Sequence, residues 1–122
     1  MTVSNNDIHS ALSVSGTTLG SAITSQIHTN PYGRGVKVIV NTLTASAGSF
    51  TVSIQGVMAG SAVTLLTSAA INATGLTTLT VYPGVAVSAN VSASDVLPRQ
   101  WQLVVTPTGF TGTANISACV IV

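Results

Sequence analysis

Two aspartates, Asp7 and Asp95, are the only carboxylate side chains that the 122-residue chain offers for acid and base chemistry. A pair that hydrolyses a glycosidic bond must share one cleft and have separated pKa values. Asp7 lies in a polar N-terminal stretch without a strand or helix pattern, so it is poorly placed to complete such a pair. We therefore interpret Asp7 as solvated and Asp95 as the cap of a turn, and we expect no catalytic residue.

Two histidines, His9 and His28, are the candidate metal ligands, and Asp7 stands two residues before His9. A zinc site needs three or four ligands that converge with tight spacing. The two histidines are far apart in the sequence and have no cysteine near them. The sequence therefore predicts surface or strand-face histidines, no metal and no cofactor.

Four further features have a structural interpretation that we prefer. The only cysteine, Cys119, follows Ile116 near the C-terminus, where a small buried apolar residue is the default. Gly33-Arg34-Gly35 resembles a phosphate loop, but no helix is expected after it. Serines are abundant, yet no Gly-x-Ser-x-Gly elbow is present. Trp101 stands on an alternating apolar face and is expected in the core, with a sugar platform or a stack on Arg99 as the alternative.

Charge is scarce along the whole chain. Asp, Glu, Lys and Arg make up 4% of the residues, against about 25% in an ordinary soluble domain. The hydrophobic content of 46% argues against disorder, and no apolar run approaches the ~20 residues of a membrane helix. With no basic stripe, we expect neither nucleic acid nor a membrane as a partner. The N-terminus lacks a signal-peptide pattern, so we expect the protein to be made and kept in a cytoplasm.

β-Branched residues alternate with small polar ones, which is typical of half-buried strands. In residues 49–55, Phe50, Val52 and Ile54 face one side. Residues 36–41 are apolar on much of both faces, which favours a central strand. Further strands are expected at 11–15, 21–28, 62–67, 77–82, 101–105 and 116–122. Turn signals between the strands include Ala47-Gly48 and Pro107-Thr108-Gly109.

Seven or eight short strands without helical periodicity predict an all-β fold, a single antiparallel β-sandwich. A jelly-roll-like sandwich is favoured, and an immunoglobulin-like sandwich is the alternative. We expect residues 1–10 to form a flexible or docking N-terminal arm and residues 11–122 to form the sandwich domain. Residues 84–98 form a long connection of mostly small side chains, which is typical of a contact surface.

The outward faces of these strands are expected to carry mostly Thr, Ser, Asn, Gln and Ala. Natural sheets place charges or proline at their edges to prevent pairing between chains, and this chain has few of either. The sequence therefore predicts that other subunits cover its edges and faces in symmetric contacts.

Three stretches of the chain carry a family resemblance. They are Leu65-Leu66-Thr67-Ser68-Ala69-Ala70-Ile71-Asn72-Ala73-Thr74-Gly75, Val81-Tyr82-Pro83-Gly84 and Asp95-Val96-Leu97-Pro98-Arg99-Gln100-Trp101. Over about residues 35–122 the chain resembles small all-β virion structural proteins of tailed bacteriophages. Such proteins resemble capsid decoration or cement proteins, which sit on the shell as oligomers, often trimers, and lock capsomers together. The chain departs from this pattern after Trp101, where Gln102 and Leu103 replace basic residues.

The resemblance implies a non-enzymatic protein on the capsid surface of the virion. It is expected to form a homo-oligomer, with a trimer favoured, and to bridge subunits of a phage major capsid protein. A tail-associated or host-surface-binding β-sandwich module is the alternative. A small hydrolase and a secreted pilus-like subunit fit the residues less well. The predicted contact residues are Asn5, Asn6, Asp7, His9, Tyr32, Arg34, Val85, Val87, Asn90, Asp95 and Arg99.

Overall fold

The computed structural model describes residues 8–14, 23–25, 27–30 and 33–121, with the backbone alone described for 8–14. Every regular element in this part of the chain is a strand, so the prediction of an all-β fold is confirmed. The strands are β1 (Ile8–Val14), β2 (Ile23–Thr24), β3 (His28–Thr29), β4 (Gly35–Met58), β5 (Ser61–Thr67), β6 (Gly75–Val81), β7 (Ser92–Ala93) and β8 (Gln100–Ile121).

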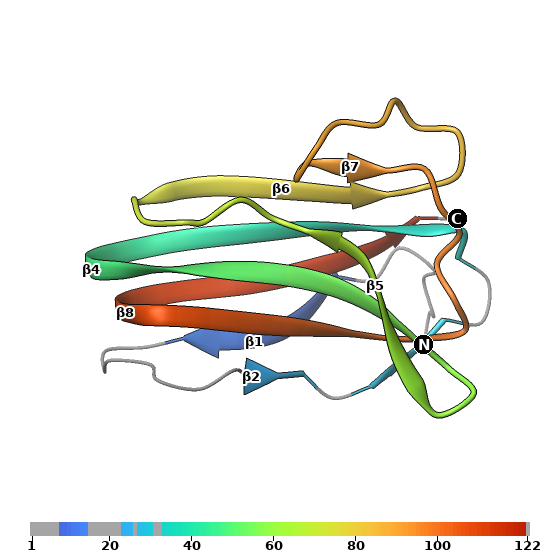
Figure 1. Cartoon of the computed structure of the whole chain (residues 1–122), viewed down its shortest axis with the longest axis horizontal. Coiled ribbons are helices and arrows are strands. Elements are labelled where there is room, and N and C mark those ends of the chain that lie inside the picture. The colour runs from blue at the N-terminus through green and yellow to red at the C-terminus, as the bar shows by residue number, and fades with distance from the viewer. Residues whose placement is uncertain (1–7, 15–22, 26, 31–32, 122) are drawn as a thin grey trace.

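The strands form one sheet with the order β1-β8-β4-β6-β7, in which β2 and β3 also pair with β8 and β5 pairs with β4. All the pairs are antiparallel except β6 and β7. The expectation of a purely antiparallel sheet is therefore wrong at β7. After β6 the chain turns back beyond the outer edge of this strand before it enters β7, so the two strands run in the same direction (Figure 1).

Two long strands, β4 and β8, each contain two of the predicted strands. Residues 36–41 and 49–55 belong to β4, and residues 101–105 and 116–121 belong to β8. The turn signals at 47–48 and 107–109 are bulges within these strands, because Ser49 pairs with both Thr108 and Gly109. Since both strands bulge at the same level, the ladder between them continues from one half to the other.

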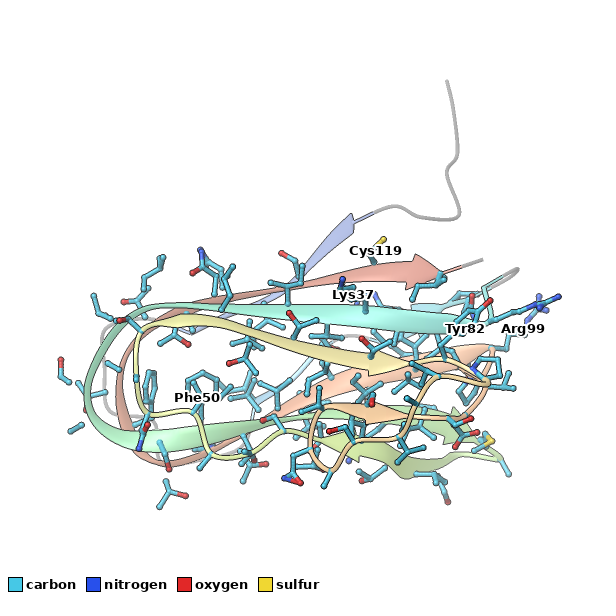
Figure 2. The ribbon with its side chains drawn as sticks, turned by 90° about the horizontal axis from the view of Figure 1, so that it is seen from above. Lys37, Phe50, Tyr82, Arg99 and Cys119 are labelled. Atoms are coloured by element: carbon cyan, nitrogen blue, oxygen red, sulfur yellow. The ribbon has the colours of Figure 1, made fainter. Side chains whose placement is uncertain are left out.

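At this level the sheet folds back on itself, so that the two halves of β4 lie over each other (Figure 2). The first half of β4 lies beside the second half of β8 and β6. The second half of β4 lies beside the first half of β8 and β5. Alternation of buried and exposed side chains stops between residues 43 and 49, where the chain makes the bend.

The core lies between the two halves of the folded sheet. The predicted inward faces are confirmed, since Phe50, Val52 and Ile54 have no exposed surface. The rings of Phe50 and Phe110 meet edge to face with centroids 4.6 Å apart and fill the core next to the bend. The other fully buried apolar side chains are Val36, Val38, Val40, Leu79, Val81, Trp101, Leu103, Val105, Ala114, Ile116 and Ala118.

The predicted strand at 21–28 is wrong as a continuous element, because only β2 and β3 pair with β8 there. Ser25 interrupts the ladder between them. Its backbone N–H donates to Leu103 O (2.8 Å), while its hydroxyl, rather than its carbonyl, accepts from Leu103 N (2.9 Å). A side chain that replaces the backbone acceptor lets the chain leave the regular strand path.

The strand β1 begins at Ile8, so residues 8–10, which the sequence assigned to the arm, pair with Cys119, Ala118 and Ser117 of β8. Residues 1–7 lie outside the described part of the chain. The arm and its boundary with the domain therefore stay a prediction.

Candidate functional site

The predicted contact residues fall into three groups. Asn5, Asn6, Asp7 and Tyr32 lie outside the described residues, and the backbone of His9 belongs to β1. Arg34, Asp95 and Arg99 lie on the segments that lead into β4 and β8. The third group, Val85, Val87 and Asn90, lies on the connection between β6 and β7.

The exposed charges of Arg34, Asp95 and Arg99 belong to segments that meet at the end of the molecule opposite the bend. The two segments are joined where Leu97 N donates to Arg34 O (2.9 Å). Asp95 Oδ1 accepts a hydrogen bond from the N–H of the next residue, Val96, at 2.8 Å. Residues 94–98 form no turn, so the prediction that Asp95 caps a turn is wrong. Figure 2 shows Arg99 extending outward from this end. The structure thus presents two cations and an anion at one end.

Asn30, which is 5% exposed, fastens this end together. Its Nδ2 donates to Gly33 O (2.8 Å) and Leu97 O (3.2 Å), and its Oδ1 accepts from Gly33 N (2.7 Å). The backbone N–H of Asn30 donates to Arg99 O (2.6 Å). One buried amide therefore holds the segments that carry the two arginines.

The connection between β6 and β7 is held by its own hydrogen bonds. The hydroxyl of Ser92 donates to Ala86 O (2.6 Å) and accepts from Ser88 N (3.0 Å). Asn90 has a φ of 64°, which closes the turn before Val91. Val87 is 72% exposed on this connection. The predicted contact loop is thus a fixed structure that presents an apolar side chain to solvent.

One edge of the sheet is partly open. On its outer side β6 pairs with β7 only at Thr80 and Val81. Thr80 N donates to Val91 O (3.0 Å) and Tyr82 N donates to Ala93 O (3.1 Å). Because the N–H groups of a strand alternate in direction, Leu76 and Thr78 present theirs to the same outer edge. In the described part of the chain, no strand pairs with that edge before Thr80.

A hollow lies beside this open edge, between the connection before β6 and the loop before β7. Among the residues that the structure describes, its lining contains no charged or titratable side chain and consists of Ala69, Ala70, Ile71, Asn72, Ala73, Thr74, Gly75, Leu76, Thr77, Thr78, Ala89, Asn90 and Val91. Leu76 is 71% exposed and Val91 is 49% exposed. Open backbone groups beside exposed apolar side chains are the features by which a sheet edge accepts another strand.

The sequence prediction did not include Leu76 among the contact residues. The sequence did contain a signal for this residue. Leu76 is a large apolar residue on the outward face of β6, which it shares with Thr78 and Thr80. The strand was expected to begin at 77, one residue after Leu76, so this face was not assigned.

A second hollow lies on the outer face of the sheet, with Lys37 and Ile39 from β4 and Ser117 and Cys119 from β8 among its lining. Lys37 and Cys119 stand together on this face (Figure 2). Cys119 is half-buried, so its prediction as a buried core residue is wrong. Because Ala118 and Val120 on either side point into the core, strand alternation turns Cys119 outward.

The aromatic and histidine candidates lie together in the fold. Trp101 is fully buried, which confirms its prediction as a core residue. The His28 ring lies 4.6 Å from the Trp101 ring, because the two residues pair across β3 and β8. Within the described residues, no group of three His, Cys, Asp or Glu side chains is placed to hold a metal ion.

No protein-family model matches the chain, and no curated protein matches it either. The part of the chain that the structure describes contains no helix long and apolar enough to cross a membrane.

Proposed function

We propose that the chain is a non-enzymatic structural subunit of a tailed-phage particle, a decoration or cement protein on the outside of the capsid. The observation that supports this proposal is the uncharged open edge of β6, with Leu76 and Val91 exposed beside it. A protein that works alone normally blunts such an edge with charge or proline. A subunit of an assembly has no such need.

The folded sheet supports a finer classification as a β-sandwich of the jelly-roll type, with an immunoglobulin-like sandwich as the alternative. The two halves of the sheet enclose one core, as the two sheets of a sandwich do. In this chain β4 and β8 pass through both halves.

Reinforcement of the shell would work by bridging. The resemblance favours a trimer that contacts two or more copies of the major capsid protein, so that several weak contacts add. The end with Arg34, Asp95 and Arg99 and the fixed loop with Val85, Val87 and Asn90 are the proposed contact surfaces. The protein would be synthesised in the host cytoplasm and would end on the capsid surface of the virion.

The test is mass spectrometry and antibody labelling of purified virions of the phage that encodes the chain. We expect the chain in the particles at a copy number comparable to that of the major capsid protein, with antibody on the outside of the heads. Its absence from the particles would overturn the proposal.

A tail-associated or host-surface-binding module is the second candidate, and the loop between β6 and β7 favours it. A rigid loop with an exposed Val87 at one side of a sheet is a suitable adhesion surface. In this case the same antibody would label tails and leave the heads unlabelled.

A further inference from the structure

Within the part of the chain that the structure describes, the open edge of β6 has free backbone hydrogen-bonding groups at two residues, Leu76 and Thr78. At Thr80 the same edge is already occupied, because Thr80 N donates to Val91 O. At the other end, the chain enters β6 through Gly75 with a φ of 133°. The segment before Gly75 lies on the other half of the sheet, where Ile71 and Phe50 exchange two backbone hydrogen bonds (2.7 and 3.1 Å). The free stretch is therefore bounded on both sides by its own chain.

A second copy of β6 fits this short edge when it is related by a two-fold axis at Thr77. A two-fold axis perpendicular to the sheet makes the two strands antiparallel. Leu76 then stands opposite Thr78 of the second copy, and Thr78 opposite its Leu76. Since these residues carry the free N–H and C=O groups, each opposed pair exchanges two hydrogen bonds, and the two Thr77 residues form the non-hydrogen-bonded pair between them.

The same register brings together the apolar side chains at the two ends of the edge. In an antiparallel pair, the beginning of one strand lies beside the end of the other. Leu76 of one copy, 71% exposed, therefore comes next to the segment of Val91 in the other, which is 49% exposed. The two-fold axis repeats this contact, so two exposed leucines and two exposed valines leave water together.

Charge does not oppose the contact in the hollow, because the described residues that line it are uncharged. Lys37 lies opposite Thr80 on β4, and the proposed register places the Lys37 residues of the two copies towards opposite ends of the paired edge. Repulsion between like charges, which normally keeps two identical sheet edges apart, is therefore absent from the described lining of this hollow.

We propose that two copies of this chain associate through the β6 edge, with Leu76 and Thr78 of each copy pairing with Thr78 and Leu76 of the other. This inference deepens the proposed function and rests on it for its biological role, because it names the contact through which the structural subunit associates. The contact makes a dimer, whereas the trimer that the resemblance favours needs a different, head-to-tail contact.

The experiment combines solution mass with directed cross-linking. Light scattering behind a sizing column should give the wild-type protein a mass twice the 12.2 kDa of one chain. In a Cys119→Ser background, Thr77→Cys should form a disulfide-linked dimer on mild oxidation, because a non-hydrogen-bonded pair places its Cα atoms about 4.5 Å apart, within disulfide range. The matched control Thr80→Cys should stay monomeric on a denaturing gel, because six residues of strand separate the two copies by about 20 Å.

A third variant, Thr78→Pro, removes the N–H at the open edge while leaving the ladder with β4 intact. We expect it to keep the wild-type circular dichroism spectrum and to fall to the mass of one chain. A wild-type monomer, a trimer, an absent Thr77→Cys cross-link, or a dimer that survives in folded Thr78→Pro would each overturn the inference.

These outcomes separate the contact from the function. A trimeric protein found on phage heads would overturn the β6 contact and leave the proposed function standing. A β6 dimer that is absent from virions would do the reverse.

Discussion

Two buried polar side chains of this protein, Asn30 and Thr42, differ in how far their hydrogen-bonding groups are satisfied. Asn30 uses both ends of its amide to bind Gly33 and Leu97. Thr42, 2% exposed on β4, has a hydroxyl group with no hydrogen-bond partner among the residues that the structure describes. A satisfied buried amide stabilises a fold, whereas a buried hydroxyl without a partner costs free energy. The two residues should therefore respond to substitution in opposite directions.

We expect Asn30→Ala to lower the free energy of unfolding by about 2–3 kcal/mol, because Leu97 O and Gly33 N lose their partner in a buried place. Urea denaturation measures the change. Asn72→Ala, at an exposed position, is the matched control and should be nearly neutral. Equal effects of the two substitutions would contradict the role given to Asn30.

We expect Thr42→Val to raise the free energy of unfolding by about 1 kcal/mol, because a methyl group of similar size replaces a hydroxyl that has no partner in the described part of the chain. The exposed Thr44→Val corrects for the higher strand propensity of valine. If the denaturation midpoint of Thr42→Val falls below that of the wild type, the hydroxyl group has a partner in solution.

The bend shared by β4 and β8 is the element that makes one sheet enclose a core. Gly48 has a φ of 69° and Gly109 a φ of 63°, both in the left-handed region that favours glycine. The two positions differ in their surroundings. A Cβ atom on Gly48 would collide with the backbone carbonyl of Gly109, whereas one on Gly109 would point into open space.

This difference predicts a graded response. Gly109→Ala should cost about 1 kcal/mol, the conformational penalty alone. Gly48→Ala should cost about 2–4 kcal/mol, since the two strands must also move apart at the bend. Thermal unfolding of both variants measures the difference, and equal losses would show that the close approach adds nothing.

Alternation in the sequence was enough to predict most elements and their inward faces, as in the case of Phe50, Val52 and Ile54. It could not show that residues 36–41 and 49–55 form one strand. The sequence around Gly48 predicts a turn that ends the strand. The strand continues through a bend instead, because a matching bulge around Gly109, some sixty residues later, keeps β4 and β8 paired. The open edge of β6 was not predicted for a similar reason. Which strand lies outermost in the sheet depends on pairing between residues that are far apart in the sequence.

At the scale of the whole molecule, the low charge means that electrostatic attraction contributes little to the contacts of this protein. Lys37 lies opposite Thr80 on the neighbouring strand β4, but the described residues that line the hollow at the β6 edge are uncharged. Contacts made there consist of backbone hydrogen bonds and apolar burial, and salt screens neither of them.

Self-association should therefore be nearly independent of ionic strength. Between about 0.05 and 0.5 M NaCl we expect the dissociation constant to change by less than about threefold, because Debye screening acts only on charge pairs. Sedimentation equilibrium at several salt concentrations measures it. A steep loss of affinity with salt would instead point to the end that carries Arg34 and Arg99 as the contact.

The position of β8 in the sheet has a consequence for synthesis. This strand pairs with β1, β2, β3 and β4, and it is made after all of them. Until residues 100–121 have left the ribosome, β1 to β3 lack their pairing partner and the inner side of β4 is uncovered. The nascent chain therefore carries unpaired strands while it is still attached to the ribosome. Other nascent copies on the same messenger RNA carry the same unpaired edges, so pairing between copies competes with folding.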